Sequence, residues 1–199
     1  MVRILTLILI LTGILTSNSK GKLDFIIEKK GFYINNVFFR YSDTLELAEF
    51  NKIIHQHPTK KKKDEEKNVH YFYGESRISV KCIAKGNREV IKKILFHINP
   101  DPDNSGEFKV KEASLCNIFF FKHNITINTK MDEMKKDTQF NSVFKWDNGV
   151  IADYIVSERG GTDMISIFFN SGDSSVANIS LPCSIAFDLN NGKEYLPQY

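Results

Sequence analysis

The sequence predicts an α+β protein made of two similar halves, each a mostly antiparallel sheet with one short helix. Three observations lead to this prediction. Most apolar segments alternate with polar residues at the two-residue period of a strand. One segment, which begins near Asp43, has the period of an amphipathic helix. The chain also resembles itself when it is shifted by 73 residues, which is typical of an internal duplication.

The internal similarity runs through the middle of each half. The shift lays the aromatic segment 71–75 onto 144–148 and continues without a gap until Phe96 meets Phe169. Other apolar residues coincide on the way: Ile78 with Ile151, Cys82 with Ile155, and Ile94 with Ile167. We therefore expect the two halves to share one order of elements.

The offset upstream differs and locates an insertion. Residues 24–28 resemble 107–111 at an offset of 83, so the first half carries ten residues more than the second. The charged run 60–68 lies between the two matched segments and is the predicted place of the insertion. The predicted organisation is a signal peptide at 1–19, a first β-rich half at 20–100, a linker at 101–106, and a second β-rich half with closing strands at 107–199.

The first half begins with a hairpin and a helix. The hairpin spans 32–39 around Asn35-Asn36, a pair suited to the positive φ of a tight turn. Asp43 is a good N-cap for the helix, and Glu46 three residues later completes a capping box. The residues that form the apolar stripe of this helix and then end it are Leu47, Phe50, Ile54 and Pro58.

Three strands complete the first half, at 71–73, 78–84 and 90–98. The last of these segments also fits the apolar face of a helix. We favour the strand because the aligned segment 164–169 is β-branched and aromatic. Gly160-Gly161 also introduces that segment from a turn.

The second half repeats this order with a weaker helix at 131–136. The strands predicted after the helix lie near Phe144, at 150–156 and at 164–169. Residues 176–199 are expected to form one or two closing strands, with a turn at Asn190-Asn191-Gly192.

The N-terminal residues indicate export. An unbroken run of apolar and small residues, 4–15, follows Arg3 and precedes the small polar residues 16–19. This order predicts a secretory signal that is cleaved after Ser19. Twelve helical residues reach only about 18 Å, short of the roughly 30 Å hydrocarbon core, so a membrane anchor is disfavoured. We expect the mature protein to be periplasmic or secreted and to have no stable membrane span.

The charge balance excludes a general attraction to polyanions. The chain has 27 Lys and Arg against 24 Asp and Glu, and removal of Arg3 with the signal leaves an excess of only two positive charges. Such a balance does not drive binding to nucleic acid or to an anionic membrane. The run Lys60–Lys63 meets the acidic residues 64–66 at once and has no interleaved aromatics. We therefore interpret it as a solvated loop and predict no nucleic-acid partner.

Three cysteines leave the disulfide pattern open. Cys82 lies on the apolar side of the alternation in 78–84, which predicts a buried free thiol. Cys116 and Cys183 either pair or stay free. Export permits a disulfide, but an odd count and wide spacing do not describe a disulfide scaffold.

The sharpest chemical motif is the segment 101–112, which has the spacing of an EF-hand calcium loop. Its candidate calcium ligands are Asp101, Asp103, Ser105 and Glu112. Gly106 stands where such a loop bends sharply. However, Pro100 and Pro102 disrupt an incoming helix, and Lys109 is a poor residue for its position in the loop. The linker is therefore the favoured interpretation, and calcium is the alternative.

Two further groups have structural interpretations that we favour. His55 and His57 could hold a metal together, but no third ligand follows from spacing, and histidine is common at a helix terminus. Trp146-Asp147 places a carboxylate beside an aromatic ring, at the position that Tyr73-Gly74 occupies in the first half. A strand start packed by a large ring explains both pairs.

No catalytic motif is present in the sequence. It contains no nucleophile elbow, zincin helix, C-x-x-C pair, Walker loop or dinucleotide-binding glycine loop. Two glycosylation sequons begin at Asn124 and Asn178, and they matter only in a host that glycosylates.

The second half carries a family resemblance. Trp146-Asp147, then Gly149-Val150, Gly160-Gly161 and the strand 164–169 resemble an uncharacterised family of exported bacterial proteins with a domain of unknown function. Its members repeat a β-rich unit. The resemblance covers nearly the whole mature chain and implies fold and compartment, with no activity or site residues. The first half departs from the motif at Gly74, which replaces the aspartate.

Together these features favour a non-catalytic binding or interaction protein of the bacterial envelope, with a protein partner. An inhibitor or immunity protein is one concrete version of this function. The alternatives are an enzyme with a dispersed site, and a calcium-binding module that uses the loop 101–112.

Overall fold

The computed structural model describes residues 22–99, 116–121, 123–147, 149–157 and 163–185, and it confirms the α+β class. The described residues are mostly strand, with three short helices. In chain order the elements are β1 Asp24–Glu28, β2 Gly31–Ile34, β3 Val37–Arg40, α2 Leu47–Ile54, β4 Lys60–Lys63, β5 Val69–Tyr73, β6 Ile78–Lys85, β7 Arg88–His97, β8 Asn117–Phe120, β9 His123–Ile125, α3 Met131–Lys136, α4 Thr138–Asn141, β10 Lys145–Asp147, β11 Ile151–Ser157, β12 Asp163–Phe169 and β13 Val176–Pro182.

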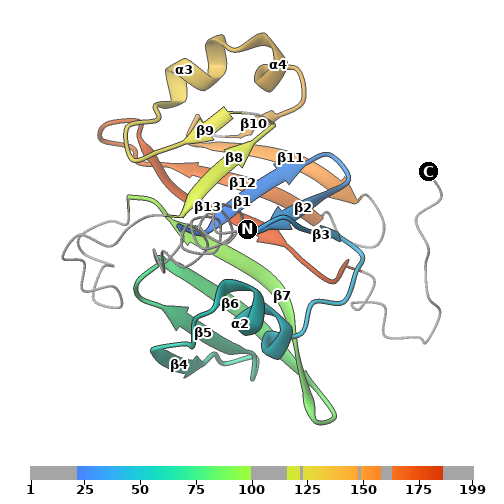
Figure 1. Cartoon of the computed structure of the whole chain (residues 1–199). Coiled ribbons are helices and arrows are strands. Elements are labelled where there is room, and N and C mark those ends of the chain that lie inside the picture. Colours follow the sequence, from blue (N-terminus) through green and yellow to red (C-terminus); the bar gives the residue numbers. More distant parts are fainter. Residues whose placement is uncertain (1–21, 100–115, 122, 148, 158–162, 186–199) are drawn as a thin grey trace, which may run out of the picture.

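The strands form two sheets, and each sheet takes strands from both halves of the chain (Figure 1). Sheet A has the order β3-β2-β1-β8-β9, and sheet B has the order β10-β11-β12-β13-β7-β6-β5-β4. The halves meet at β1–β8 in sheet A, where the strands are parallel, and at β7–β13 in sheet B, where they are antiparallel. All the other strand pairs of the described chain are antiparallel.

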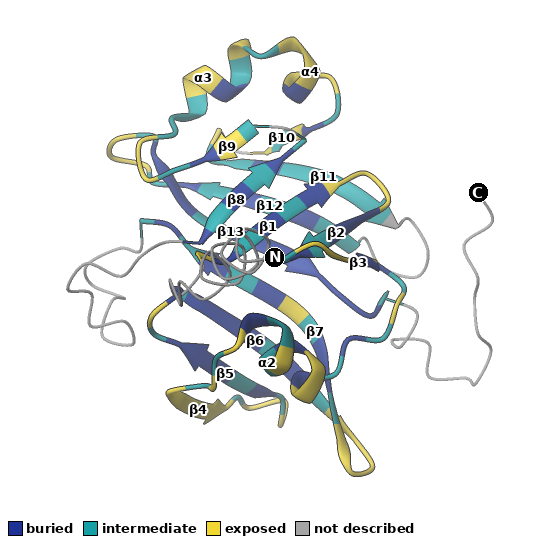
Figure 2. Ribbon diagram, in the orientation of Figure 1, coloured by how far each residue is buried: buried dark blue, intermediate teal, exposed yellow. Residues whose placement is uncertain are grey.

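The core lies between the two sheets. Sheet A and α2 lie on the same side of sheet B, and α3 and α4 lie beside β9 and β10 (Figure 1). In β1 the side chains of Phe25 and Ile27 point inward and are fully buried. The ring of Phe25 meets the ring of Phe96 of β7 edge-on, with the centroids 4.7 Å apart. Figure 2 shows that buried residues run through the strands of both halves, which therefore share one core.

Several predicted elements are confirmed. Asn35 and Asn36 have φ of 47° and 70° and form the tight turn between β2 and β3. The apolar stripe of α2 is buried, as expected for an amphipathic helix. The segment 90–98, which also fitted a helix, lies mostly in β7. The weaker helix of the second half is α3, at the predicted residues.

The predicted start of the first helix is wrong. Helix α2 begins at Leu47, after the N-cap Glu46, whose side chain makes no capping bond. The Asp43 carboxylate instead accepts a hydrogen bond from the backbone N–H of Arg40 at 2.8 Å. Asp43 thus closes a turn after β3, since a short carboxylate serves a turn as readily as a helix start. His55, with φ of 53°, ends the helix before Pro58 is reached.

The lysine run forms a strand. Residues Lys60–Lys63, predicted to lie in a loop, pair with β5 as the edge strand β4, and all four are exposed. The turn that follows is ordered by Asp64, whose Oδ1 accepts hydrogen bonds from the backbone and side chain of Asn68. Burial opposes ionisation of Asp64, but bonds from His70 and Asn68 outweigh it and hold its pKa well below the usual range.

The structure also refines the internal similarity. The aligned aromatics Tyr73 and Trp146 both point inward, and each packs on the helical segment of its own half, through Phe50 and Phe140. However, Tyr73 pairs with Ile78, whereas Trp146 pairs with Ala152. The second hairpin is one residue longer, so an offset of 74 aligns Ile78 with Ala152, and both residues are fully buried.

Some predictions fall outside the described residues. These are the signal peptide 1–19, the linker 101–106, the turn at Gly160-Gly161 and the turn at Asn190-Asn191-Gly192. In the part of the chain that is described, no helix is both long enough and apolar enough to cross a membrane.

Candidate functional site

The predicted calcium ligands Asp101, Asp103, Ser105 and Glu112 all lie outside the described residues. Among the described residues, no group of three or more His, Cys, Asp or Glu side chains is placed to hold a metal ion. His55 is the C-cap of α2, and both it and His57 are exposed. The helix-terminus interpretation of these histidines therefore agrees with the structure.

All three cysteines are buried free thiols. This confirms the prediction for Cys82 and shows that Cys116 and Cys183 do not pair. Burial raises the pKa of the Cys82 and Cys116 thiols to about 12, because an apolar environment disfavours the thiolate. Such thiols are neither nucleophiles nor metal ligands at neutral pH.

Among the residues that the structure describes, Ser79 and His97 come closest to a catalytic pair. The Ser79 Oγ lies 2.9 Å from the His97 Nε2, which is the distance of a nucleophile and its base. However, the Ser79 side chain is only 4% exposed. A nucleophile must meet its substrate, so this pair is better explained as a cross-strand hydrogen bond between β6 and β7.

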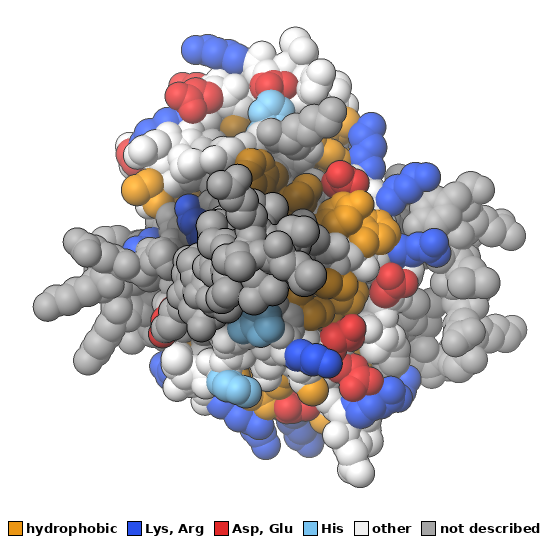
Figure 3. Space-filling model, viewed as in Figure 1, with side chains coloured by type: hydrophobic (Ala, Val, Ile, Leu, Met, Phe, Trp, Pro, Cys, Tyr) orange, Lys and Arg blue, Asp and Glu red, His pale blue; other side chains and the backbone are white. Residues whose placement is uncertain are grey.

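The outer face of sheet A carries a row of apolar side chains. In β1 the side chain of Ile26 points away from the core, and its neighbours across the sheet are Tyr33 in β2 and Phe119 in β8. Tyr33 in turn pairs with Phe38 in β3. We call these four side chains, Phe38, Tyr33, Ile26 and Phe119, the aromatic row. Figure 3 shows hydrophobic side chains on the side of the molecule where sheet A lies.

Phe38 is the most exposed member of the row. Its side chain is 41% exposed, and its ring centroid lies 4.9 Å from that of Tyr33. A Cβ atom at Gly31 would lie 2.8 Å from the Phe38 ring, so glycine at this position leaves the space that the ring occupies. One side of the ring therefore packs on Tyr33 and over Gly31, and the other side faces solvent.

The edge of sheet A beside the row offers little free backbone. Arg40, at the end of β3, uses its N–H on the Asp43 carboxylate, and its carbonyl accepts the Asp43 N–H at 3.0 Å. Only a short stretch of β3 is left to pair with a further strand. A partner at this place must therefore contact side chains of the face.

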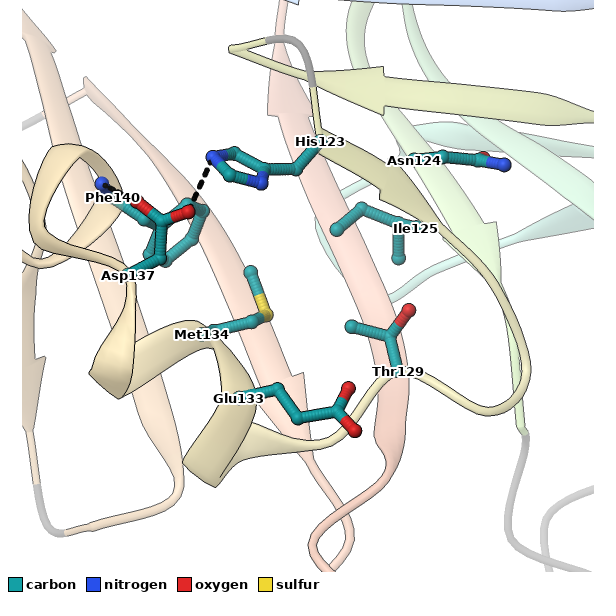
Figure 4. A pocket seen from close by; sticks show the side chains of 8 residues that line it. All are labelled: His123, Asn124, Ile125, Thr129, Glu133, Met134, Asp137 and Phe140. Carbon is teal, nitrogen blue, oxygen red and sulfur yellow. Dashed lines mark hydrogen bonds and ion pairs between the residues drawn. The ribbon is translucent and has the colours of Figure 1, made fainter.

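A pocket of about 160 Å³ opens next to the end of the row, between β9 and the helices α3 and α4. Figure 4 shows its lining side chains: His123, Asn124, Ile125, Thr129, Glu133, Met134, Asp137 and Phe140. Its apolar part is made by three buried side chains, Ile125, Met134 and Phe140. Asn124 pairs with Phe119 at the end of the row, and its side chain points away from those of the other lining residues.

Asp137 and His123 both line this pocket, and their side chains are in contact with each other (Figure 4). The Asp137 Oδ1 accepts hydrogen bonds from the N–H groups of Gln139 and Phe140 and so caps α4. Its Oδ2 lies 3.2 Å from the His123 Nε2. That nitrogen is buried and has no well-aligned hydrogen-bond partner in the described structure.

Trp146 is a packing residue. Its ring stacks on Phe169 at 5.9 Å, its Nε1–H donates to Asn141, and the ammonium of Lys135 lies 4.8 Å from its centre. These contacts agree with the prediction of a strand start packed by a large ring. Asn124 is exposed and Asn178 is half-buried, so the first sequon is the more accessible.

The pattern of the sequence did not point to the row or the pocket. The row joins four strands, and its members become neighbours only through sheet register, which a single sequence does not give. The pocket depends on β9 and α4, two elements that no pattern in the sequence predicted. Comparisons with protein-family models, curated proteins and solved structures found no match, so the candidate site is defined by the geometry of this chain itself.

Proposed function

We propose that this chain is an exported, non-catalytic binding protein that recognises a protein partner through the aromatic row on the outer face of sheet A. An inhibitor or immunity protein that covers an exported toxin is one concrete form of this function. The single observation that supports it best is the continuous register of Phe38, Tyr33, Ile26 and Phe119 across four strands.

The chemistry of the row suits a protein interface. Aromatic residues are enriched in the centres of interfaces, and a ring held in place loses little conformational entropy on binding. Charged side chains border the row at the ends of β1 and β3, where Asp24 and Glu28 lie on its outer face and Arg40 is exposed. An apolar centre with a polar rim is the usual arrangement of a binding surface.

Two features of the described residues weigh against catalysis. The thiols are buried and hold a raised pKa, and the Ser79 hydroxyl is nearly inaccessible. The pocket beside the row holds a histidine and carboxylates, but the carboxylate nearest to His123 is occupied by the helix cap. A binding role requires no reactive thiol, hydroxyl or free carboxylate, so it is compatible with the state of all these groups.

The test is partner capture with matched variants. The tagged full chain, expressed in the cells that make it and cross-linked, is recovered together with its neighbours for mass spectrometry. Phe38→Ser removes the exposed ring of the row. Ile127→Ser removes a side chain of similar exposure, 46%, that lies outside the row.

We expect Phe38→Ser to lose at least one protein that both the wild type and Ile127→Ser retain. Both variants change an exposed residue, so their melting temperatures should stay close to that of the wild type. The same set of proteins from all three chains would contradict the proposed role of the row.

A further inference from the structure

We infer that the pocket between β9, α3 and α4 receives one basic side chain of the partner, an arginine or a lysine. This inference rests on the proposed function, because the pocket lies beside β9, the edge strand of sheet A next to Phe119 of the row, on the side of that strand opposite to the row. It adds a charged contact at the pocket to the apolar contact that the row provides.

The size of the pocket restricts its occupant. Pockets for drug-sized molecules usually measure about 300–1,000 Å³. This pocket, at about 160 Å³, is smaller and fits a single side chain. Its place next to β9 means that a partner on the row reaches it by crossing one edge strand, since Phe119 of the row pairs with Asn124.

The lining favours a cation with an apolar stem. Ile125, Met134 and Phe140 are 4%, 5% and 1% exposed and form an apolar wall that suits methylene groups. The carboxylates of Glu133 and Asp137 supply the negative charge (Figure 4). Glu133 lies within α3 and Asp137 is the C-cap of that helix, where its backbone N–H donates to the Glu133 carbonyl.

The two carboxylates are differently engaged. Asp137 is fixed by the cap of α4 and by the contact with His123, so its position is set before a partner arrives. Glu133 is exposed, and no described residue forms an ion pair with it. A guanidinium or ammonium group entering the pocket finds one fixed carboxylate and one that can close on it.

The test uses the full chain and small probes, with no partner required. N-acetyl-arginine amide and N-acetyl-lysine amide carry the two candidate side chains. N-acetyl-citrulline amide has the shape of the arginine probe without its charge. Each probe is titrated while backbone amide resonances are recorded by NMR, and the amides of Ile125, Thr129 and Phe140 report on the pocket.

We expect at least one cationic probe to shift these resonances with a dissociation constant in the millimolar range, and the citrulline probe to leave them unchanged. Glu133→Gln and Asp137→Asn should each weaken binding roughly tenfold, the usual effect of losing a charge-assisted bond. Asparagine is also a good N-cap, so Asp137→Asn keeps the start of α4. Asp132→Asn, on an exposed residue of the same helix, should change affinity less than about twofold.

The inference is overturned if citrulline binds as well as arginine, if no probe shifts the pocket resonances, or if Asp132→Asn weakens binding as much as Glu133→Gln. Partner capture that depends on Phe38 without probe binding would leave the proposed function and remove this inference. Probe binding without such capture would count against the proposed function and not against the pocket.

Discussion

Leu45 and Ser184 stand 139 residues apart in the chain and are joined by a buried hydrogen bond. The backbone N–H of Leu45 donates to the Oγ of Ser184 at 3.0 Å, and both residues are almost fully buried. The neighbouring Ile185 N–H donates to the carbonyl of Tyr41. The residues that follow β13 thus close the core against the segment that leads into α2.

Ser184→Ala should lower the free energy of unfolding by about 1–3 kcal/mol, because it leaves the buried N–H of Leu45 without an acceptor. Serine and alanine bear similar strain at the φ of 52° found here, so the comparison isolates the hydrogen bond. Ser142→Ala, at an exposed site, is the control and should cost less than about 0.5 kcal/mol. Urea unfolding of the wild type and the two variants measures the free energies of unfolding. Equal losses in Ser184→Ala and Ser142→Ala would show that the buried hydrogen bond stabilises the fold no more than an exposed one.

Asn36→Gly should stabilise the protein by roughly 0.5–1 kcal/mol, because glycine adopts a φ of 70° without strain. Asn35→Gly should instead destabilise it. The Asn35 side chain accepts from the Asp24 N–H and donates to the Ile53 carbonyl, so it ties the hairpin to β1 and α2. Opposite changes in the thermal melting temperature are expected, and a stabilising Asn35→Gly would contradict this account.

The sequence was most informative where local pattern and tertiary fold demand the same thing. The hairpin at Asn35-Asn36 and the stripe of α2 follow from local rules, and the structure confirms both. The helical alternative for 90–98 was correctly rejected, since β7 lies in the middle of sheet B with the buried residues Ile94 and Phe96. In these segments backbone preference and burial agree.

Other elements depended on contacts that no local pattern contains. Asp43 fitted a capping box, yet its carboxylate serves the turn at Arg40. The strand β4 has only lysines, and it is extended because β5 offers it a partner. Strand β8 owes its place to pairing with β1, more than ninety positions earlier in the chain. The aromatic row and the pocket also depend on contacts between distant segments, so local pattern did not predict them.

The thiols should make the protein sensitive to alkaline pH. Burial raises the pKa of Cys82 and Cys116 from about 9 to about 12, so above pH 9 the unfolded chain ionises while the folded chain does not. The stability that the buried neutral thiols contribute is fully present below pH 9 and is lost as the pH rises toward 12. For each thiol, the free energy of unfolding falls by up to about 1.4 kcal/mol per pH unit. The melting temperature should fall over this range, and it should fall less steeply in Cys82→Ala. Parallel slopes in the two chains would exclude this thiol as a cause.

The lysines of β4 should protect the edge of sheet B. Charged side chains on an edge strand discourage pairing with a second molecule. Replacing Lys60 and Lys62 by threonine, a good strand former, should increase association measured by light scattering. The same two-charge change at Lys29 and Lys52, which are exposed and lie outside the sheet edges, is the control. Equal scattering from both double variants would assign the effect to net charge alone.

The loop 101–112 is tested by calcium. The linker interpretation predicts that millimolar calcium and chelator give the same melting temperature. A ligand that binds only the folded state would raise it. A rise that Asp103→Ala abolishes would therefore make this loop a calcium site.

The meeting of the halves at β1–β8 and β7–β13 has a consequence for how the chain acquires its structure. Synthesis delivers β1 and β7 long before their central partners β8 and β13 exist. During that interval each of these strands has one side without its neighbour, and contacts this distant in sequence form slowly. The newly made first half is thus the vulnerable species, prone to pair with other chains. A chaperone that binds the first half should therefore reduce aggregation most while the second half is still being synthesised. Slower synthesis of the second half should increase aggregation.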